Sequence, residues 1–169
     1  PAGVVYNWYS VPIGGAVLGT GPTFITPILT TNVTYYVGTC PGFARFPIQI
    51  TVDQVSASYT NTSVCAGNPT SFSATATSSL GTITGYLWDF GDGNGTGTGG
   101  NTNYTYALGG NYQAQLIAID NRGCADTVLN SVTVYTSPVI NFTTTASGGC
   151  SGLTVGFINN TTGGTSYTW

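Results

Sequence analysis

Tyr86-Leu-Trp-Asp-Phe-Gly-Asp-Gly93 is the most specific motif in this 169-residue chain. In a β-strand, residues i and i+2 point to the same face, so Trp88 and Phe90 would enter one hydrophobic core. Gly91 and Gly93 would follow in a tight turn, where glycine adopts backbone angles that strain other residues. The stretch therefore predicts a buried strand that ends in a tight turn.

The start of this stretch recurs along the chain. A tyrosine is followed two residues later by a tryptophan at Tyr6 and Trp8, at Tyr86 and Trp88, and at Tyr167 and Trp169. The tryptophans lie 80 and 81 residues apart, which is a period typical of tandem domains. We therefore expect the chain to start and stop inside a domain. The predicted units are a partial domain at 1–53, a complete sandwich at 54–136 and the opening strands of a further repeat at 137–169.

The rest of the sequence predicts an all-β fold. Short runs rich in valine, isoleucine, threonine and tyrosine indicate strands at 4–9, 34–38, 46–52, 70–77, 86–90, 111–120, 127–135 and 154–158. The 25 glycines disfavour helices, and no stretch repeats apolar residues at helical spacing. The predicted fold class is all-β, with tandem immunoglobulin-like β-sandwiches and partial domains at both ends.

The composition excludes several classes of function. The charged residues are five aspartates and two arginines, and the chain has no lysine, glutamate, histidine or methionine. Without histidine, a Ser-His-Asp or Cys-His nucleophile cannot be assembled, and without lysine there is no Schiff-base chemistry. Two arginines cannot neutralise a phosphate backbone, so nucleic acid is not an expected partner. We expect no catalysis and no cofactor within these residues.

Length and charge give no sign of a membrane protein. The net charge is −3, and no run approaches the 18 apolar residues that a spanning helix needs. No basic start followed by an apolar stretch indicates a signal peptide, so a signal would lie upstream of these residues. We expect no membrane span.

The four cysteines fall into two positional classes. Cys65 and Cys150 each stand before a strand, with glycine and phenylalanine at matching offsets, whereas Cys40 and Cys124 each stand late in a domain. One member of each class per domain predicts a disulfide between Cys65 and Cys124, which would stabilise the domain by roughly 4 kcal/mol. Cys40 and Cys150 are then candidates for a disulfide between neighbouring repeats. Zinc is the competing use, although the chain has no Cys-x-x-Cys pair.

The central segment resembles a known family. The stretch 86–93 is followed by Tyr104-Thr-Tyr-Ala-Leu-Gly-Gly-Asn-Tyr112, by Ala114-Gln-Leu-Ile-Ala-Ile-Asp120 and by Gly123-Cys124. This order strongly resembles the polycystic-kidney-disease (PKD) domain, whose hallmark is a Trp-Asp-Phe-Gly-Asp-Gly strand and turn. Beside that resemblance, Tyr106 and Tyr112 fit aromatics that pack where strands enter the second sheet, one of them as a tyrosine corner.

The flanking segments resemble related repeats. The first segment is similar to an immunoglobulin-like repeat of Bacteroidota surface proteins at Tyr6-Asn-Trp-Tyr9, Gly19-Thr-Gly-Pro-Thr-Phe24, Thr34-Tyr-Tyr-Val37 and Arg45-Phe-Pro-Ile-Gln-Ile-Thr-Val52. Residues 138–169 resemble the opening third of a further PKD-like repeat. These resemblances imply a large secreted protein, often exported by the type IX system, that serves as an adhesin, a filament or a spacer beside polysaccharide-degrading domains.

These observations predict a structural and adhesive repeat region of an extracellular bacterial surface protein or filament, without catalysis. The alternative is a spacer or carbohydrate-binding accessory region of a large secreted polysaccharide-degrading enzyme. The expected partners are neighbouring copies of the repeat, joined covalently or by strand complementation, because the last segment supplies strands before the tryptophan and the first supplies those after it. Surface glycans are further candidates, and Tyr9, Tyr35 and Tyr59 could stack on sugars if exposed.

Two other sites follow from short motifs. Asp89 and Asp92 could cap the glycine-rich turn as Asx turns, or they could bind Ca²⁺, although two carboxylates make an incomplete cage. The structural role is the favoured interpretation. Asp126-Thr127-Val128 resembles the Asp-Ser/Thr-apolar signal for O-glycosylation in Bacteroidota, which makes Thr127 a candidate for modification.

Overall fold

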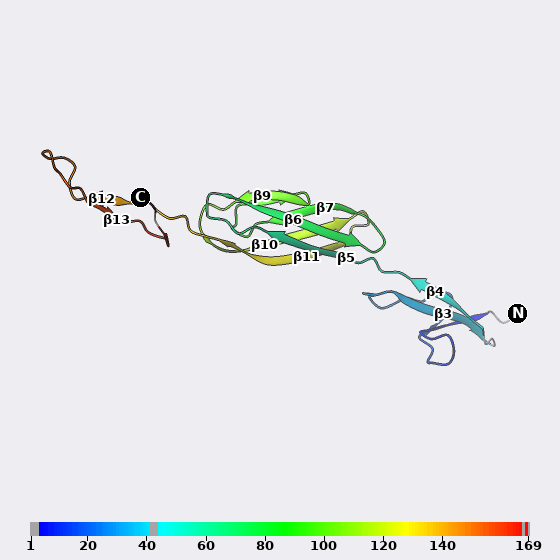
Figure 1. The fold of residues 1–169 in the computed structure, drawn as a ribbon. Helices are drawn as coiled ribbons and strands as arrows, with labels where there is room; N and C mark the ends of the chain where they lie inside the picture. Colours follow the sequence, from blue (N-terminus) through cyan, green and yellow to red (C-terminus); the bar gives the residue numbers. More distant parts are fainter. Residues whose placement is uncertain (1–3, 41–43, 167, 169) are drawn as a thin grey trace. The chain divides into compact units, whose positions relative to one another are not determined.

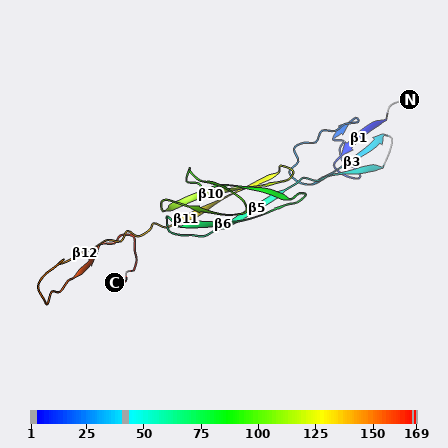
Figure 2. The same ribbon diagram turned by 90° about the horizontal axis from the view of Figure 1, so that it is seen from above.

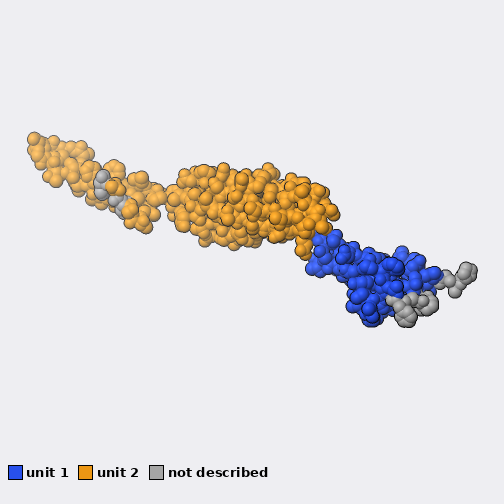
Figure 3. All heavy atoms as spheres, turned by 45° about the vertical axis from the view of Figure 1, so that its right-hand side comes forward, with its two compact units in different colours: residues 1–53 blue, residues 54–169 orange. Residues whose placement is uncertain are grey.

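The computed structural model describes residues 4–40, 44–166 and 168, with the side chain of Cys40 outside the description. The chain divides into two compact units, residues 1–53 and residues 54–169, which Figure 3 distinguishes by colour. The described residues form strands and no helix, so the predicted all-β immunoglobulin-like fold is confirmed. None of their segments is a helix that could cross a membrane.

The first unit contains one antiparallel sheet. Its strands are β1 (Val5–Tyr9), β2 (Gly19–Thr20), β3 (Val33–Cys40) and β4 (Arg45–Ile50), arranged in the order β2-β1-β3-β4. One row across the sheet joins Trp8 to Val37 and Val37 to Phe46. Since paired residues share a face, the three apolar side chains lie on the same side of the sheet.

The second unit contains a complete sandwich of two sheets (Figures 1 and 2). One sheet has the order β11-β10-β7-β8 and the other has the order β5-β6-β9. The strands are β5 (Val55–Asn61), β6 (Pro69–Ser78), β7 (Ile83–Asp89), β8 (Thr96–Thr98), β9 (Asn101–Thr105), β10 (Gly110–Asp120) and β11 (Ala125–Val134). The alternation of buried and exposed residues along β10 is what a strand with one covered face requires.

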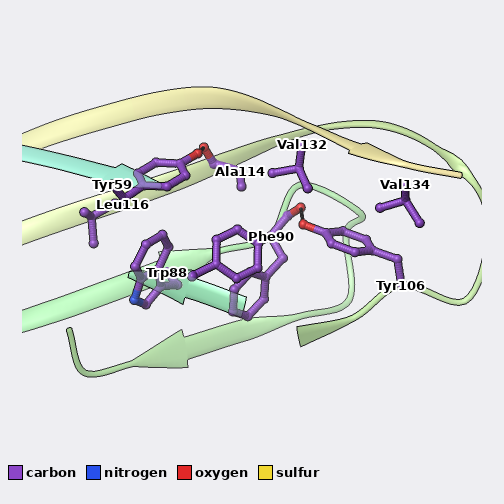
Figure 4. Close-up of a cluster of buried hydrophobic side chains, with 9 residues drawn as sticks. Tyr59, Trp88, Phe90, Tyr106, Ala114, Leu116, Val132 and Val134 are labelled. Atoms are coloured by element: carbon purple, nitrogen blue, oxygen red, sulfur yellow. Dashed lines mark hydrogen bonds between the residues drawn. The ribbon is translucent and has the colours of Figure 1, made fainter. Parts of the chain in front are cut away.

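An aromatic core joins the two sheets (Figure 4). The ring of Trp88 lies 5.0 Å from that of Tyr59 and 5.3 Å from that of Phe72, measured between centroids. Phe90 packs on Phe72 at 5.1 Å and is 1 % exposed. The prediction that Trp88 and Phe90 enter one core is therefore confirmed, because both belong to one buried cluster with residues of both sheets.

The turn after β7 has the predicted glycine chemistry. Gly91 and Gly93 have φ angles of 77° and 78°, in the left-handed region that favours glycine. A side chain at Gly91 would also make its Cβ collide with the carbonyl oxygen of Gln113. This turn can therefore approach the neighbouring strand only because Gly91 has no side chain.

Tyr112 forms the predicted tyrosine corner. Its hydroxyl donates a hydrogen bond to the carbonyl oxygen of Leu108, at 2.7 Å, and its ring stacks on Tyr106 at 4.2 Å. Tyr106 is completely buried and donates its own hydroxyl to the carbonyl oxygen of Phe90, at 2.9 Å. The two tyrosines thus connect the start of β10 to the end of β7 across the core.

The last segment contains a short hairpin of β12 (Phe142–Thr144) and β13 (Phe157–Asn159). Phe142 pairs with Asn159 and Thr144 pairs with Phe157, so both phenylalanines lie on the same face. The strand predicted at 154–158 corresponds to β13, which starts later than expected, at Phe157.

Candidate functional site

The same tryptophan and glycine arrangement occurs in both units. In the first unit, Trp8 pairs with Gly19, and its indole N–H donates to the carbonyl oxygen of Gly21 at 3.0 Å. In the second unit, Trp88 pairs with Gly97, and its indole N–H donates to Gly99 at 2.9 Å. Each indole therefore packs as an apolar ring while its one polar atom is satisfied.

The strand order shows that the two sheets are equivalent. The order β2-β1-β3-β4 of the first unit matches the order β8-β7-β10-β11 of the second, with the tryptophan strand in the same place. Val37 lies beside Trp8 as Leu116 lies beside Trp88. The sheet register therefore recurs at Trp8 and Trp88, whereas Tyr167 and Trp169 of the third predicted pair lie outside the described residues.

The candidate calcium ligands Asp89 and Asp92 are used by the turn itself. The carboxylate of Asp89 accepts the N–H of Gly91 at 2.9 Å, and one carboxylate oxygen of Asp92 accepts the N–H groups of Asn94 and Gly95 at 3.0 and 3.1 Å. These are the Asx-type contacts that the structural interpretation predicted. Calcium binding at these residues stays a prediction, in which the ion would compete with these hydrogen bonds.

A tyrosine contact sets the ionisation of Asp92. Tyr104 donates its hydroxyl to the second carboxylate oxygen at 2.6 Å. Burial alone would raise the pKa of Asp92, but the hydrogen bonds from Tyr104 and from the N–H groups of Asn94 and Gly95 outweigh it and lower that pKa. The same hydrogen bond, together with burial, raises the pKa of Tyr104 to about 12. Asp92 is therefore held ionised, as its role of accepting hydrogen bonds requires.

Two further aspartates have structural roles that the sequence analysis missed. Asp120 is 3 % exposed and accepts hydrogen bonds from the hydroxyl of Ser78 and from the N–H groups of Arg122 and Cys124, all at 2.9 Å. Asp126 accepts the N–H of Ala57 at 2.9 Å, which links β11 to β5. The Asp-x-x-Gly pattern from Asp120 to Gly123 is a turn signal that could have indicated the first of these roles.

The predicted disulfide between Cys65 and Cys124 is wrong. Both are free thiols, and they lie at opposite ends of β11. Cys65 forms a bridge with Tyr135 beyond the last residue of that strand, whereas Cys124 precedes the first. β11 has 10 residues, so at about 3.3 Å per residue it holds the two cysteines roughly 30 Å apart. Disulfide formation needs Cα atoms within about 7 Å.

The second cysteine prediction falls partly outside the description. Cys150 is exposed and is a free thiol, whereas the side chain of Cys40 lies outside the described residues. Their pairing between repeats therefore stays a prediction. Nothing in the positions of Cys65 and Cys124 supports it, because cysteines of these two classes stand at opposite ends of a sandwich.

Thr127 is accessible for modification. It lies on β11, at the edge of its sheet, and its side chain is exposed. The carboxylate of Asp126 accepts the N–H of Thr127 at 2.9 Å, so the backbone of the motif is fixed by its own aspartate. Glycosylation of Thr127 stays a prediction.

The tyrosines considered for stacking on sugars are largely unavailable. Tyr35 and Tyr59 are each 7 % exposed, so the expectation that they could be exposed was wrong. Tyr59 packs on Trp88, and its hydroxyl donates to the carbonyl oxygen of Ala114 at 2.6 Å. Tyr9 is half-buried, and the guanidinium of Arg45 lies 3.2 Å from its ring centroid. A sugar would have to displace that cation.

The tryptophan face of the first sheet carries apolar side chains that reach solvent. Phe46 is 71 % exposed, Tyr6 is 39 % exposed and Ile48 is 38 % exposed. Tyr6 lies two residues from Trp8, Phe46 pairs with Val37, and Ile48 lies two residues from Phe46. All three side chains therefore point to the same face of the sheet as Trp8. We call this surface the open face of the first sheet.

The hairpin of the last segment also carries exposed aromatics. Phe142 and Phe157 are 55 % and 58 % exposed, and their ring centroids lie 6.4 Å apart. A groove of about 320 Å³ runs along the same hairpin and includes Phe142 and Asn159 in its wall. These two apolar surfaces, and not a cluster of reactive groups, are the strongest candidate functional features of the described residues.

Comparison with known proteins finds a family match within each unit. The PKD domain family matches residues 54–134, and the family described as "Ig-like domain CHU_C associated" matches residues 1–53. No curated protein matches the chain.

Several solved structures are similar to this chain. The PKD1 domain of the Vibrio cholerae metalloprotease PrtV is 31 % identical over 46 % of this chain and 93 % of that domain, with a TM-score of 0.42. The PKD1 domain of Vibrio anguillarum Epp is 22 % identical over 49 % of this chain and 95 % of that domain, with a TM-score of 0.45. A structure of carbohydrate-binding modules from the β-sandwich superfamily is 24 % identical over 56 % of this chain and 44 % of that chain, with a TM-score of 0.45.

Domains of both families are usually non-catalytic and act as structural or accessory modules. The chain therefore belongs to the PKD domain family through residues 54–134, while residues 1–53 match the family described as "Ig-like domain CHU_C associated".

Proposed function

We propose that this chain is a structural repeat region of an extracellular bacterial surface protein, in which its sandwiches separate and display other parts of that protein. The observation that carries the proposal is the recurrence of one sheet, with the same tryptophan to glycine hydrogen bond, in two units of different families. The feature that the two units share is therefore the framework of the sheet. PKD domains are typical of extracellular or secreted proteins, which supports the location.

The polar chemistry of the second unit supports a structural role. Asp89, Asp92, Asp120 and Asp126 all accept backbone N–H groups, so their carboxylates are committed to turns and strand contacts. The chain has no histidine, glutamate or lysine to supply a general base. These facts favour a module that spaces or adheres over one that catalyses.

A replacement experiment tests the spacer role. The segment would be exchanged, in its full-length parent protein, for unrelated immunoglobulin-like sandwiches of equal residue number, and surface display and cell adhesion would be measured. If the segment acts as a spacer, the exchange leaves both unchanged, whereas its deletion reduces them. Loss of adhesion on exchange would show that the segment itself binds a ligand.

Antibody labelling tests the location. An antibody raised against residues 54–136 should label intact cells as strongly as permeabilised cells. Labelling that needs permeabilisation would contradict the extracellular assignment. Binding of the purified chain to insoluble polysaccharide would instead favour the accessory region of a polysaccharide-degrading enzyme, a role for which the burial of Tyr35 and Tyr59 leaves fewer aromatic contacts.

A further inference from the structure

A third surface, on the side of the first sheet away from Trp8, combines aromatic rings with a positive charge. In the second unit, Trp88 points to the covered face of its sheet, whereas its neighbour Leu87 points to the other side and is 46 % exposed. By the same alternation, Tyr9 points away from the face that carries Trp8. We call the side that carries Tyr9 the outer face of the first sheet. A second sheet packed on Trp8 would leave the outer face in contact with solvent.

One row of the outer face carries two tyrosines and a proline. Tyr9 pairs with Tyr36, and Tyr36 pairs with Pro47, so the three side chains lie side by side across β1, β3 and β4. Both tyrosines are half-buried and Pro47 is exposed. The ring of Tyr36 stacks on no other aromatic ring of the described residues. The row therefore forms a platform of cyclic side chains that solvent reaches.

Arg45 lies beside this row. It stands two residues before Pro47 and pairs with Gly38, so its side chain points to the same outer face. Its guanidinium lies 3.2 Å from the ring centroid of Tyr9, which is a cation–π contact. A Cβ at Gly38 would lie only 3.3 Å from Cγ of Arg45, so the glycine leaves the room in which the arginine side chain runs. The guanidinium is thus held in one place at the edge of the platform.

Arg45 retains hydrogen-bond donors for a ligand. Its Nη1 group donates to the carbonyl oxygens of Val11 and Gly14, at 2.7 and 2.6 Å. These bonds use two of the five N–H groups of a guanidinium, and Nε and Nη2 donate to no acceptor in the part of the chain that the structure describes. The edge that joins Nε and Nη2 carries two parallel N–H groups, an arrangement that binds both oxygens of a carboxylate.

The charge of Arg45 is not neutralised within its unit. Asp53 is the only acidic residue of positions 1–53, and it follows Arg45 by eight residues, beyond the last residue of β4. Arg45 forms no ion pair with any of the described residues. An anion at Arg45 would therefore meet a cation that no neighbouring carboxylate has neutralised.

The second unit has the same framework without this chemistry. The row that corresponds to the platform carries an acid, an amide and an aliphatic side chain, namely Asp89, Gln115 and Leu129. Thr127 takes the place of Arg45. Since the two units share the framework and differ on the outer face, the fold does not require the platform or the arginine. They supply a property of the first unit alone.

We propose that the outer face of the first sheet binds an acidic polysaccharide whose sugar rings carry carboxylates. The carboxylate of one uronic acid residue accepts the N–H groups of Nε and Nη2 of Arg45, and its ring packs on Tyr36 and Pro47. Arg45 and Pro47 are two residues apart on β4, about 7 Å, so one sugar residue reaches both. The inference rests on the proposed extracellular location and adds a ligand to the structural role.

Titration of the isotopically labelled chain with a short oligogalacturonate, followed by NMR, tests the proposal. We expect amide shifts at Tyr36, Gly38 and Arg45 and none in the second unit. The same oligomer with its carboxylates methyl-esterified should bind at least roughly tenfold more weakly, because it keeps the rings and loses the charge. Polyglutamate of equal charge should also bind at least roughly tenfold more weakly, because it has carboxylates but no rings.

Arginine variants separate the site from general charge. Arg45→Gln should raise the dissociation constant at least roughly tenfold. Arg45→Lys should retain part of the affinity, because it keeps the charge and loses the planar pair of donors. Arg122→Gln is the matched control, since it removes the same charge from the second unit and should leave the affinity unchanged.

Tyrosine variants test the platform separately. Tyr36→Leu should raise the dissociation constant roughly threefold to tenfold. It leaves the bonds of Arg45 to Val11 and Gly14 in place, so it is informative even if the arginine variants alter that loop. Tyr135→Leu removes a ring that is 56 % exposed in the second unit and should have no effect. Amide spectra show whether each variant is still folded.

Four results would overturn the inference: no amide shifts around Arg45 in the unmodified chain, equal binding of the esterified oligomer, equal binding of polyglutamate, or an equal loss in Arg122→Gln. Equal binding of polyglutamate would identify the ligand as an acidic peptide instead. All four concern the ligand and not the location of the chain. Antibody labelling of cells tests that location independently, so the failure of this inference is distinguishable from the failure of the proposed function.

Discussion

At the scale of single residues, the second unit uses buried polar groups sparingly. Tyr59, Tyr106 and Trp88 each direct their one polar atom to a backbone carbonyl. Thr70 differs, because it is completely buried and its hydroxyl finds no hydrogen-bond partner in the described part of the chain. An unpaired hydroxyl in an apolar core destabilises the folded state.

Thr70→Val should therefore stabilise the second unit. The substitution keeps the shape of the side chain and removes the unpaired hydroxyl, so we expect the free energy of unfolding to rise by about 1 kcal/mol. Urea unfolding followed by tryptophan fluorescence measures the change. Thr75→Val is the matched control on the same strand, since the hydroxyl of Thr75 is exposed and lies 2.9 Å from that of Ser58. An equal gain in both variants would contradict the explanation.

Asp92 should make stability depend on acid pH. Its pKa is lower in the folded chain than the unperturbed value of 3.8, so its contribution is complete above about pH 4 and is lost as the pH falls through the lowered value. Asp92→Asn should reduce stability at pH 7 and flatten this loss between about pH 4 and pH 2. Urea midpoints across that range measure the effect.

Tyr104→Phe serves as the partial control for that prediction. It removes the hydroxyl hydrogen bond but leaves the N–H groups of Asn94 and Gly95 in place, so the pH dependence should shrink without disappearing. If Asp92→Asn leaves the acid limb of the stability curve unchanged, another carboxylate controls it.

At the scale of elements, the turn between β7 and β8 contains two glycines at which a side chain would have different costs. At both positions the left-handed backbone would be strained, but at only one would the side chain collide with a neighbouring strand. Gly91 and Gly93 have nearly the same positive φ, but a Cβ at Gly93 meets no atom within 4 Å, whereas one at Gly91 meets the backbone of Gln113. β7 can therefore end close to β10 only because position 91 carries no side chain.

Gly91→Ala should therefore destabilise the chain more than Gly93→Ala. The left-handed backbone alone costs about 1–2 kcal/mol, which is the change expected for Gly93→Ala. For Gly91→Ala the collision with Gln113 adds to that cost, so we expect at least twice the loss. Thermal unfolding by circular dichroism measures both, and equal losses would show that the turn relaxes away from Gln113.

The elements that the sequence predicted well are those with strong periodicity. β7, β10 and β11 combine β-branched or aromatic residues with alternation, and their strands were predicted within a few residues. β8 and β9 were missed, because Thr96–Thr98 contains a glycine and Asn101–Thr105 contains two asparagines, and both residue types are depleted in strands. Their pairing with β7 and β6 imposes the strand, so tertiary context overrode local preference.

At the scale of the whole molecule, the recurring tryptophans predicted the repeat, but the cysteines misled. Equivalent positions in sequence showed which cysteines correspond, yet they carried no information about which end of a sandwich each occupies. That property depends on the direction of β11, which only the sheet order reveals. The candidate surfaces had the same limit, since exposure of Phe46 or Phe157 follows from what covers them and not from their neighbours in sequence.

The free thiols provide a prediction for the whole chain. In a variant with Cys40→Ser and Cys150→Ser, thiol titration in denaturant without reductant should find two free thiols, and dithiothreitol should leave the thermal midpoint unchanged. A disulfide between Cys65 and Cys124 would instead add roughly 4 kcal/mol of stability and remove both thiols. Finding no free thiol in the monomer would restore the disulfide.

The short parallel bridge at Cys65 has a mechanical consequence. The chain enters the sandwich at Gln54, beside Ser79, and leaves it after Tyr135, where the N–H of Ala66 and the carbonyl of Val64 bond to Tyr135 at 2.8 and 2.9 Å. Ala57 contacts Asp126 near the starts of β5 and β11, so the first and last strands run in the same direction. Tension between the two ends would therefore pull these strands past each other in shear, and the bonds at Tyr135 would have to break together instead of opening one at a time.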